Sequence, residues 1–522
     1  MFTSSLVNSG VKSALLAAFF SGTKLFDRNK KDTEKEILRA IDDLNDGKNL
    51  QTSAGILEGL GSNEHKQQCV RKLNNLALCI LGANGSSLCE YASSSHANNY
   101  PAICPELMEK LEKISLDDEW NKALLWYSIN ACNEDDLACN DMTLWNRPSN
   151  INKLIRLLNI LLSKTELNYG SCIVDQGALD VLHDLFEHFS NSNVAVCIYI
   201  LKILANIAME SEFCADRIVR SQWISTLLLS LSHKNETVQI IAQKIFLNIL
   251  YSLGFKKTSL GSGLYEFYST PYCTNPEIDI VLLHGMRGAA FRTWRQKDDS
   301  ANVTIQCWPK VWLPTNVQGH IRILAVDYSS ALYGGDLLEN LHARATRVFE
   351  LLIRAGIGDR PVIFICHSMG GLLAKQILID SPFMRHNTVG VLFMATPHYG
   401  TPVATNYSIK VFRPTADLKL LMEGSEANQR LHSEFVKCEP KVPLMLNVSE
   451  TIQSPLFGTV KNMLVPCFSS SFNGCALFHV PEMHHNVCKP ASKDALSYRI
   501  IVKFIEDALQ YVRSKARSGH SC

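Results

Sequence analysis

The residue best placed to do chemistry is a serine at the junction of an apolar run and a helix-forming run. Residues 362–371 read VIFICHSMGG, and the helix-forming residues LLAK follow directly. A strand, a sharp turn and a helix in this order form a nucleophile elbow, which presents the serine hydroxyl at the carboxyl end of a sheet. The turn crowds the positions two before and two after the serine, and these hold Cys366, where glycine is usual, and Gly370. The pattern predicts Ser368 as a nucleophile; the alternative is an ordinary turn with an incidental serine.

A serine hydroxyl is a poor nucleophile unless an oriented histidine takes its proton. In folds built around such an elbow the chain order is serine, acid, histidine, so the base lies on a late loop before the last helix. His484 fits this position, and its neighbour His485 is the alternative. His398 comes too early to be the base and is expected to line the substrate pocket. His479 lies in a stretch rich in serine and glycine and is expected at the surface.

The acid that orients the histidine should end a strand between Ser368 and His484. Glu450 does so, because it follows the apolar run at 443–448. Its carboxylate would hold the histidine tautomer and stabilise the imidazolium. The other acids in this interval lie in helical or loop sequence and are expected to be solvated: Asp417, Glu423 and Glu434.

The tetrahedral intermediate of acyl transfer needs two hydrogen-bond donors for its oxyanion. One candidate is the backbone N–H of Met369, directly after the nucleophile. The other is the backbone N–H of Met286, in the strand-end sequence HGMRG at 284–288, where glycines let the backbone approach a substrate closely. A plain tight turn is the alternative for this loop. The residues expected to line the substrate pocket lie beside these groups: His284, Gly285, His367 and His398.

Short apolar runs alternate with helical patterns in the second half of the chain, which is typical of a mostly parallel α/β sheet. The predicted strands cover residues 278–284, 321–327, 362–366, 389–395, 443–448 and 463–465. One helix is expected between the second and third strands, and a last helix carries the apolar residues from 501 to 512. With the elbow, acid and histidine in this order, residues 259–522 are predicted to form an α/β-hydrolase domain. The insert at 407–439 is either a lid over an acyl pocket or two packed helices.

The first half of the chain predicts helices only, because apolar residues recur at helical spacing from about residue 35 to residue 255. Two stretches repeat. IVDQGAL at 173–179 resembles IVRSQWI at 218–224, an offset of 45, and ILANI at 203–207 resembles IFLNI at 245–249, an offset of 42. Helical repeats of about 40–47 residues predict an armadillo/HEAT-like stack over residues 32–258. An irregular all-helical domain is the alternative.

Composition and charge describe a globular protein with no general attraction for nucleic acid. Hydrophobic residues make up 46% and charged residues 19%, and 51 lysines and arginines balance 50 aspartates and glutamates. The 17 cysteines are scattered without a C-x-x-C pair, which favours free thiols in a reducing compartment over a disulfide framework. Residues 1–31 contain no acid before Asp27 and carry the apolar run ALLAAFF at 14–20. We expect this segment to be a targeting or anchor segment; an amphipathic first helix is the alternative.

The catalytic half resembles the serine-active-site-containing protein one family. The resemblance rests on HGMRGAAFRTWRQ at 284–296, CWPKVWL at 307–313, GDRPV at 358–362, HSMGGLL at 367–373, NVCKP at 486–490 and KDA at 493–495. It implies a lipase-like, membrane-associated protein of the contact zone between mitochondria and endoplasmic reticulum, associated with phosphatidylglycerol remodelling and, through it, with intracellular cholesterol handling. By motif, Ser368, Glu450 and His484 take the places of the family's nucleophile, strand-end glutamate and histidine. Cys366 and His485 depart from the family's pattern.

These observations favour a serine hydrolase or transacylase that acts on acyl esters of a glycerophospholipid at a membrane surface. The helical repeats offer a place for a protein partner. The chemistry requires no metal and no organic cofactor, and no nucleic acid is expected as a partner. The alternatives are a soluble carboxylesterase or protein deacylase, and an interaction scaffold in which the hydrolase half is only a structural module.

Overall fold

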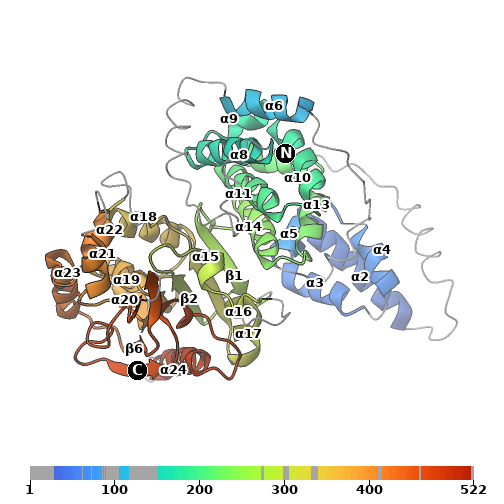
Figure 1. Cartoon of the computed structure of the whole chain (residues 1–522). Helices are drawn as coiled ribbons and strands as arrows, with labels where there is room; N and C mark the ends of the chain where they lie inside the picture. Colours follow the sequence, from blue (N-terminus) through green and yellow to red (C-terminus); the bar gives the residue numbers. More distant parts are fainter. Residues whose placement is uncertain are drawn as a thin grey trace.

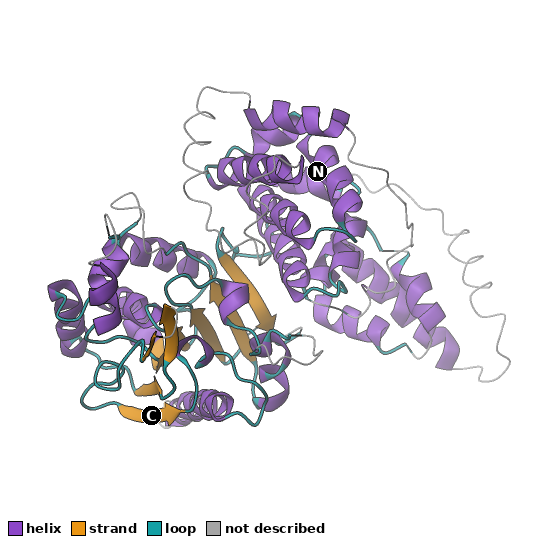
Figure 2. Ribbon diagram, viewed as in Figure 1, coloured by secondary structure: helices purple, strands orange, loops and turns teal. Residues whose placement is uncertain are grey.

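A helical region precedes a sheet-containing region in the computed structural model of the chain (Figures 1 and 2). The structure describes residues 29–60, 63–71, 73–84, 86, 89, 105–116, 150–271, 275–297, 305–330, 339–408, 414–457 and 460–518. Residues 1–28 of the predicted N-terminal segment lie outside these ranges, and the first described helix begins at Asn29. In the described part of the chain, no helix combines the length and apolar character needed to cross a membrane. The twelve cysteines that the structure describes are free thiols.

The described helices of the first region are α2 (Asn29–Asn45), α3 (Leu50–Glu58), α4 (Asn63–Val70), α5 (Asn75–Ala83), α6 (Pro105–Leu116), α8 (Asn150–Glu166), α9 (Gly170–Asp175), α10 (Ala178–Phe189), α11 (Val194–Glu210), α12 (Glu212–Val219), α13 (Trp223–Ser230) and α14 (Glu236–Ser252). The side chains of Asn193, Ser211 and Asn235 cap α11, α12 and α14 by accepting a backbone N–H of the first turn.

Two consecutive units of this region share one order, in which two shorter helices precede a helix of 17 residues. They are α9 to α11 and α12 to α14, and they contain the two sequence repeats. The long helices α8, α11 and α14 pack side by side. Across the units, the indole N–H of Trp223 donates to the carbonyl of Leu179 at 3.0 Å. The predicted helical region is therefore present, while its assignment to the armadillo/HEAT class stays a prediction.

The second region is built on a seven-stranded sheet in the order β1-β3-β2-β4-β5-β6-β9. Only β1 is antiparallel, and the other neighbouring strands are parallel. The strands are β1 (Leu264–Ser269), β2 (Ile278–Leu283), β3 (Ile321–Val326), β4 (Val362–His367), β5 (Thr388–Met394), β6 (Leu444–Glu450) and β9 (Ala476–Val480), and a separate hairpin pairs β7 (Ser454–Phe457) with β8 (Val460–Asn462). Every residue of β2, β3 and β4 is buried, as expected for central strands covered on both faces. The predicted α/β-hydrolase class of fold is confirmed.

Helices cover both faces of this sheet. The described helices of this region are α15 (Ala290–Thr293), α16 (Trp308–Val311), α17 (Leu313–Asn316), α18 (Leu341–Arg354), α19 (Gly370–Asp380), α20 (Pro382–Asn387), α21 (Pro402–Ser408), α22 (Ala416–Leu421), α23 (Glu426–Lys437), the 3-10 turn η4 (His484–Asn486) and α24 (Leu496–Ser518). Gly390 of β5 faces Phe504 of α24, whereas Phe393, three residues further, faces Lys375 of α19. Because side chains alternate along a strand, α24 and α19 lie on opposite faces.

The strand prediction was wrong at the edges of the sheet. Residues 463–465 form no strand; they lie in a turn after β8. The strand beside β6 is instead β9, which was not predicted; it contains the short apolar run ALF at 476–478, but most of its side chains are exposed. His479 is exposed, as expected, but it belongs to β9 and not to a loop. Strand β1 was also not predicted.

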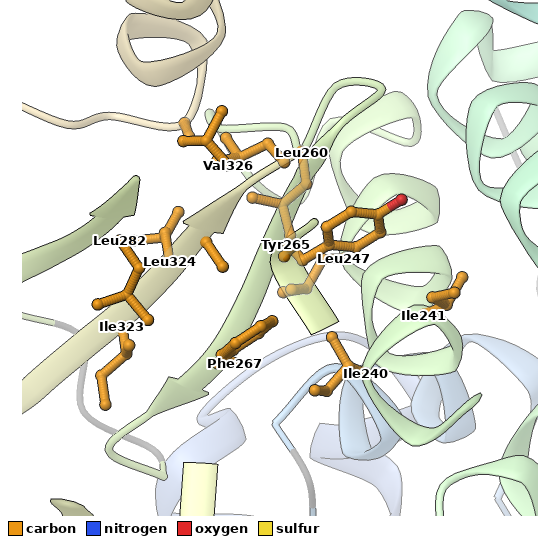
Figure 3. Packing of buried hydrophobic residues seen from close by; sticks show 14 of the residues in the cluster. Ile240, Ile241, Leu247, Leu260, Tyr265, Phe267, Leu282, Ile323, Leu324 and Val326 are labelled. Carbon is orange, nitrogen blue, oxygen red and sulfur yellow. The ribbon is translucent and has the colours of Figure 1, made fainter. Parts of the chain in front are cut away.

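The helical region packs directly on the edge strand β1. Ile240 and Leu247 of α14 lie against Tyr265 and Phe267 of β1, within one continuous cluster of buried apolar residues (Figure 3). The connecting segment is held by Asn248 of α14, whose amide donates to the carbonyl of Leu260 at 3.0 Å and accepts its N–H at 2.9 Å. The two regions therefore share a core.

The insert between α21 and β6 contains packed helices. Leu418 and Leu421 of α22 and Leu431 and Phe435 of α23 are buried, and α23 lies against α19. The apolar residues 411 and 412 of the predicted insert lie outside the described residues. The expectation that Asp417 is solvated was wrong, because its side chain is 2% exposed and forms an ion pair with Arg344.

Candidate active site

Ser368 occupies a sharp turn between β4 and α19 at the carboxyl end of the sheet. Its φ of 51° lies in the left-handed region, which a non-glycine residue adopts only where the surrounding structure enforces it. Its backbone N–H donates to the carbonyl of Met394 at 2.8 Å, which ties the turn to β5. A Cβ at Gly370 would overlap the carbonyl oxygens of Leu283 and His284, so the small residue after the serine is required by the close approach of the end of β2.

The structure brings Ser368, His484 and Glu450 together, although they are separated by up to 116 residues. Oγ of Ser368 lies 3.0 Å from Nε2 of His484, and Nδ1 of His484 lies 2.5 Å from Oε2 of Glu450. All three side chains are buried, with Glu450 only 1% exposed. They follow β4, end β6 and follow β9, three parallel strands whose carboxyl ends meet at one edge of the sheet.

The second oxygen of Glu450 is fixed by the backbone. Oε1 accepts the N–H of Leu464 at 2.8 Å and the N–H of Val465 at 3.1 Å. Two backbone donors and the imidazole therefore hold this buried carboxylate in one orientation. Sequence reasoning placed a strand at these residues and so missed their contact with the acid.

His485 is not connected to the serine. Its side chain is exposed, and in the part of the chain that the structure describes no hydrogen bond joins it to Ser368. Desolvation by the protein around the ring and the neighbouring His484 lower the pKa of the His485 imidazole, so it is neutral at neutral pH. Of the two neighbouring histidines, only His484 has the geometry of a base for Ser368.

The loop after β2 lies directly against the serine. A Cβ at Gly285 would lie 2.7 Å from Cβ of Ser368, so only glycine allows this approach. Among the described residues, no acceptor pairs with the backbone N–H of Met286 or of Met369. Two unpaired donors therefore flank Ser368, one in this loop and one at the start of α19, as stabilisation of an oxyanion requires.

The four residues predicted to line the pocket have different environments. Gly285 and His367 adjoin Ser368, and Nε2–H of His367 donates to the backbone carbonyl of His484 at 3.0 Å. Burial, together with the nearby His484, lowers the pKa of His367 well below its ordinary value. The prediction was wrong for His284 and His398, because both are completely buried and line no open surface.

The buried polar contacts of these two histidines explain their positions. His284 stacks on the ring of Tyr328, with centroids 4.0 Å apart. Nε2 of His398 lies 3.0 Å from the amide oxygen of Asn447 on β6, and its ring packs against Phe393 and Phe472. Both imidazoles are therefore buried in the loops that follow β2 and β5. In the described ranges, no cluster of three or more histidine, cysteine or acidic side chains has the arrangement of a metal site.

A mostly parallel sheet of this order, with a serine elbow after β4, defines the α/β-hydrolase class. Within that class, residues 277–436 match the family model of the PGAP1-like alpha/beta domain. The chain is also homologous to Protein SERAC1, which confirms the resemblance seen in the sequence: it is 31% identical over 336 residues to the Bos taurus protein, covering 59% of this chain and 51% of that protein. It is 32% identical over 369 residues to the Danio rerio protein, covering 65% of this chain and 55% of that protein. The chain thus spans about half the length of the curated relatives it matches.

Among solved structures, the chain is similar to the mature lipase BlEst2 of Bacillus licheniformis. The sequence identity is 15% and the TM-score is 0.35, with 46% of this chain and 97% of that chain covered.

Proposed function

We propose that this chain is a serine hydrolase or transacylase of lipid acyl esters, with Ser368 as nucleophile, His484 as general base and Glu450 as the acid that orients it. The observation that carries the proposal is the continuous contact from Ser368 Oγ through the imidazole of His484 to Glu450, at 3.0 and 2.5 Å. A buried carboxylate on Nδ1 leaves Nε2 free to accept the serine proton, which is the arrangement that activates a serine.

The reaction follows from these positions. Oγ of Ser368 attacks the ester carbonyl while Nε2 of His484 takes its proton, and the backbone N–H groups of Met286 and Met369 stabilise the oxyanion. The intermediate then expels the alcohol, which leaves with the proton held by His484. Water or a lipid hydroxyl attacks the acyl-enzyme in the same way, giving a fatty acid or a new ester. Gly285 and His367, beside the serine, border the position of the substrate carbonyl.

The proposed substrate is a glycerophospholipid, with phosphatidylglycerol as the first candidate, in a remodelling reaction linked to mitochondrial function and intracellular cholesterol trafficking. This finer proposal is supported by the homology to Protein SERAC1 and by the motif-level resemblance of the catalytic half. The proposed site of action is a membrane surface, in the contact region between mitochondrion and endoplasmic reticulum. A protein partner on the helical repeats remains part of the same proposal.

Labelling with a fluorophosphonate probe tests the catalytic step. The wild type should take the label, and Ser368→Ala and His484→Ala should lose it. His485→Ala is the matched control, because it removes the adjacent imidazole without touching the serine, and it should still be labelled. If the folded wild type takes no label, or if His485→Ala behaves as His484→Ala does, the proposed triad is wrong and the scaffold alternative gains.

A lipid screen then tests the substrate. Vesicles containing phosphatidylglycerol, phosphatidylcholine or phosphatidylethanolamine are incubated with wild type and Ser368→Ala, and the released fatty acids and new acyl species are measured by mass spectrometry. Serine-dependent turnover that favours phosphatidylglycerol supports the proposal. Turnover confined to short soluble esters, or to acylated peptides, would instead identify the carboxylesterase or the protein deacylase.

A further inference from the structure

A buried ion pair attaches the insert to the body of the hydrolase. Arg344 of α18 is 1% exposed, and its guanidinium donates to both carboxylate oxygens of Asp417 of α22, at 2.9 and 3.0 Å. The same guanidinium donates to the carbonyl of Glu339 at 3.0 Å. Such a bidentate pair fixes both partners in direction as well as distance. Helix α22 therefore cannot shift without separating two buried charges.

The guanidinium of Arg344 also lies over an aromatic ring that supports the loop after β2. Its Cζ is 5.5 Å from the ring centroid of Tyr328, the second residue after β3. Among the described residues, the hydrogen bonds and the ring stacking of Tyr328 are with His284: the two rings stack 4.0 Å apart at 13°, the phenol O–H donates to the carbonyl of His284, and the backbone N–H of Tyr328 donates to Nε2 of His284 at 3.2 Å. Tyr328 thus connects a cation on one side with a histidine on the other.

His284 passes this constraint to the loop that borders Ser368. Because its Nε2 accepts a backbone N–H, its Nδ1 carries the proton and donates to the carbonyl of Gly285 at 2.8 Å. The N–H of Gly288 donates to the same carbonyl at 3.0 Å and closes the turn around Met286. The direction of the Met286 N–H therefore depends on how His284 is held.

We propose that Asp417, Arg344 and Tyr328 are positioning residues, which couple insert helix α22 to the loop from Gly285 to Gly288. Side-chain contacts connect these three residues to one another and to His284, and none of the three touches the reacting atoms. It rests on the proposed function only in identifying this loop as the oxyanion side of the site. A movement of the insert that separates Asp417 from Arg344 would leave the buried guanidinium with only the more distant Glu339 carboxylate, at 3.9 Å, and would free it to leave the ring of Tyr328, so the insert and the loop are ordered together.

Hydrogen exchange of the backbone amides tests this coupling without requiring activity. The variant Asp417→Asn removes the charge from the insert and keeps its shape. The matched control is Asp279→Asn, because Asp279 is equally buried and receives a bidentate Arg322 at 2.7 and 3.0 Å, but lies at the opposite end of β2 from His284. Exchange is compared in the peptide spanning residues 284–292, under native conditions in which global unfolding contributes nothing.

We expect exchange in this peptide to accelerate about tenfold in Asp417→Asn and to stay within about twofold of wild type in Asp279→Asn. A conservative variant, Tyr328→Phe, keeps the stacked ring and removes only the O–H donor, and it should lower kcat for a short soluble ester about tenfold with KM nearly unchanged, because misplaced oxyanion donors affect the transition state alone. Equal exchange in the two aspartate variants, or an unchanged kcat in a folded Tyr328→Phe, would overturn the coupling. If wild type shows no serine-dependent activity, the proposed function fails, while the exchange data still decide whether the insert and the loop are coupled.

Discussion

Glu450 and His484 are joined at 2.5 Å, and the contact uses only one of the two carboxylate oxygens. The other oxygen accepts the backbone N–H groups of Leu464 and Val465. The acid is therefore oriented from two sides, and the backbone decides which oxygen faces the imidazole. The orientation of a glutamine side chain at position 450 can therefore be predicted.

The variant Glu450→Gln should fold normally and lose most of its activity. The two backbone N–H groups will retain the amide oxygen, so the amide NH₂ must face Nδ1 of His484 and donate to it. That selects the tautomer with the proton on Nε2, which cannot accept the proton of Ser368. We expect kcat to fall about 10³- to 10⁴-fold, with little change in thermal stability, measured on a chromogenic ester.

The control for this substitution is Glu482→Gln. Glu482 lies two residues before His484 and pairs with Lys297 at 2.8 Å, outside the contact chain of the site. Its activity should stay within about threefold of wild type, as expected for a partly exposed ion pair. A Glu450→Gln variant that keeps comparable activity would show that another group orients His484.

Gly370 is the glycine whose replacement the elbow should tolerate least. A methyl group there would overlap the carbonyl oxygens of Leu283 and His284, and backbone atoms cannot rotate away. We expect Gly370→Ala to reduce the free energy of unfolding by at least about 2 kcal/mol in urea titrations, because overpacking of this kind displaces the backbone. Gly55→Ala is the control: a methyl group there meets nothing within 4 Å, so this helical position should gain up to about 1 kcal/mol. Equal stability of both variants would mean that the end of β2 can move away from the elbow.

The central strands could be predicted from the sequence because each is a continuous apolar run, as expected of a strand buried on both faces. The elbow could be predicted because one such run leads directly into the serine turn and a helix. The serine, the acid and the histidine could be ordered because the fold fixes their sequence along the chain. The edge strands could not be found in this way: β9 exposes most of its side chains, and β1 ends in half-buried residues. Residues 463–465 read as a strand because they are apolar, yet their backbone N–H groups serve Glu450 instead of a sheet.

The burial of some polar and charged side chains was also predicted wrongly from the sequence. An aspartate in a helical pattern is usually solvated, but Asp417 is buried because Arg344, 73 residues earlier in the chain, neutralises it. The histidines His284 and His398 were expected in the pocket because histidine near an active site often contacts substrate. Each has a buried polar partner far away in the sequence: the backbone N–H of Tyr328 donates to Nε2 of His284, and Nε2 of His398 lies 3.0 Å from the amide oxygen of Asn447. Pairings of this kind depend on tertiary contacts that no local pattern encodes.

The junction of the two regions should depend on Asn248 more than on its counterpart in the preceding unit. Asn248 is fully buried and serves three backbone groups, two of Leu260 and the carbonyl of Ala205 at 2.9 Å. Asn206, which occupies the same place in the sequence repeat, donates one hydrogen bond to Thr165 at 3.1 Å. We expect Asn248→Ala to lower the free energy of unfolding by about 3 kcal/mol and Asn206→Ala by about 1 kcal/mol in urea titrations. The cost is larger for Asn248→Ala because this substitution leaves buried backbone groups without hydrogen-bond partners. Similar costs would indicate that water replaces the lost amide at the junction.

Lys375, a buried lysine of the helix that follows the elbow, predicts a pH dependence of stability. Its side chain has no exposed surface, and its Nζ lies 2.8 Å from Nδ1 of His432. The amine is otherwise enclosed by aromatic rings, with centroids 5.4 to 5.8 Å away, those of Phe393, Phe435 and Phe472. Burial lowers the pKa of Lys375 well below its ordinary value, so the folded protein holds a neutral amine where the unfolded chain holds a charged one.

The sign of the pH dependence follows from that difference. Between pH 8 and 10 the unfolded chain binds a proton that the folded protein lacks, so the free energy of unfolding rises with pH, by up to about 1.4 kcal/mol per unit for this one group. Lys375→Met should be more stable than wild type at pH 8 and should lack this part of the slope, in urea titrations at pH 8, 9 and 10. Lys503→Met, at an exposed lysine of α24, should still show the rise of the free energy of unfolding between pH 8 and 10. If Lys375→Met kept the full wild-type slope, the lysine would be charged in the folded protein, and the three rings would then bind a cation and not merely enclose an amine.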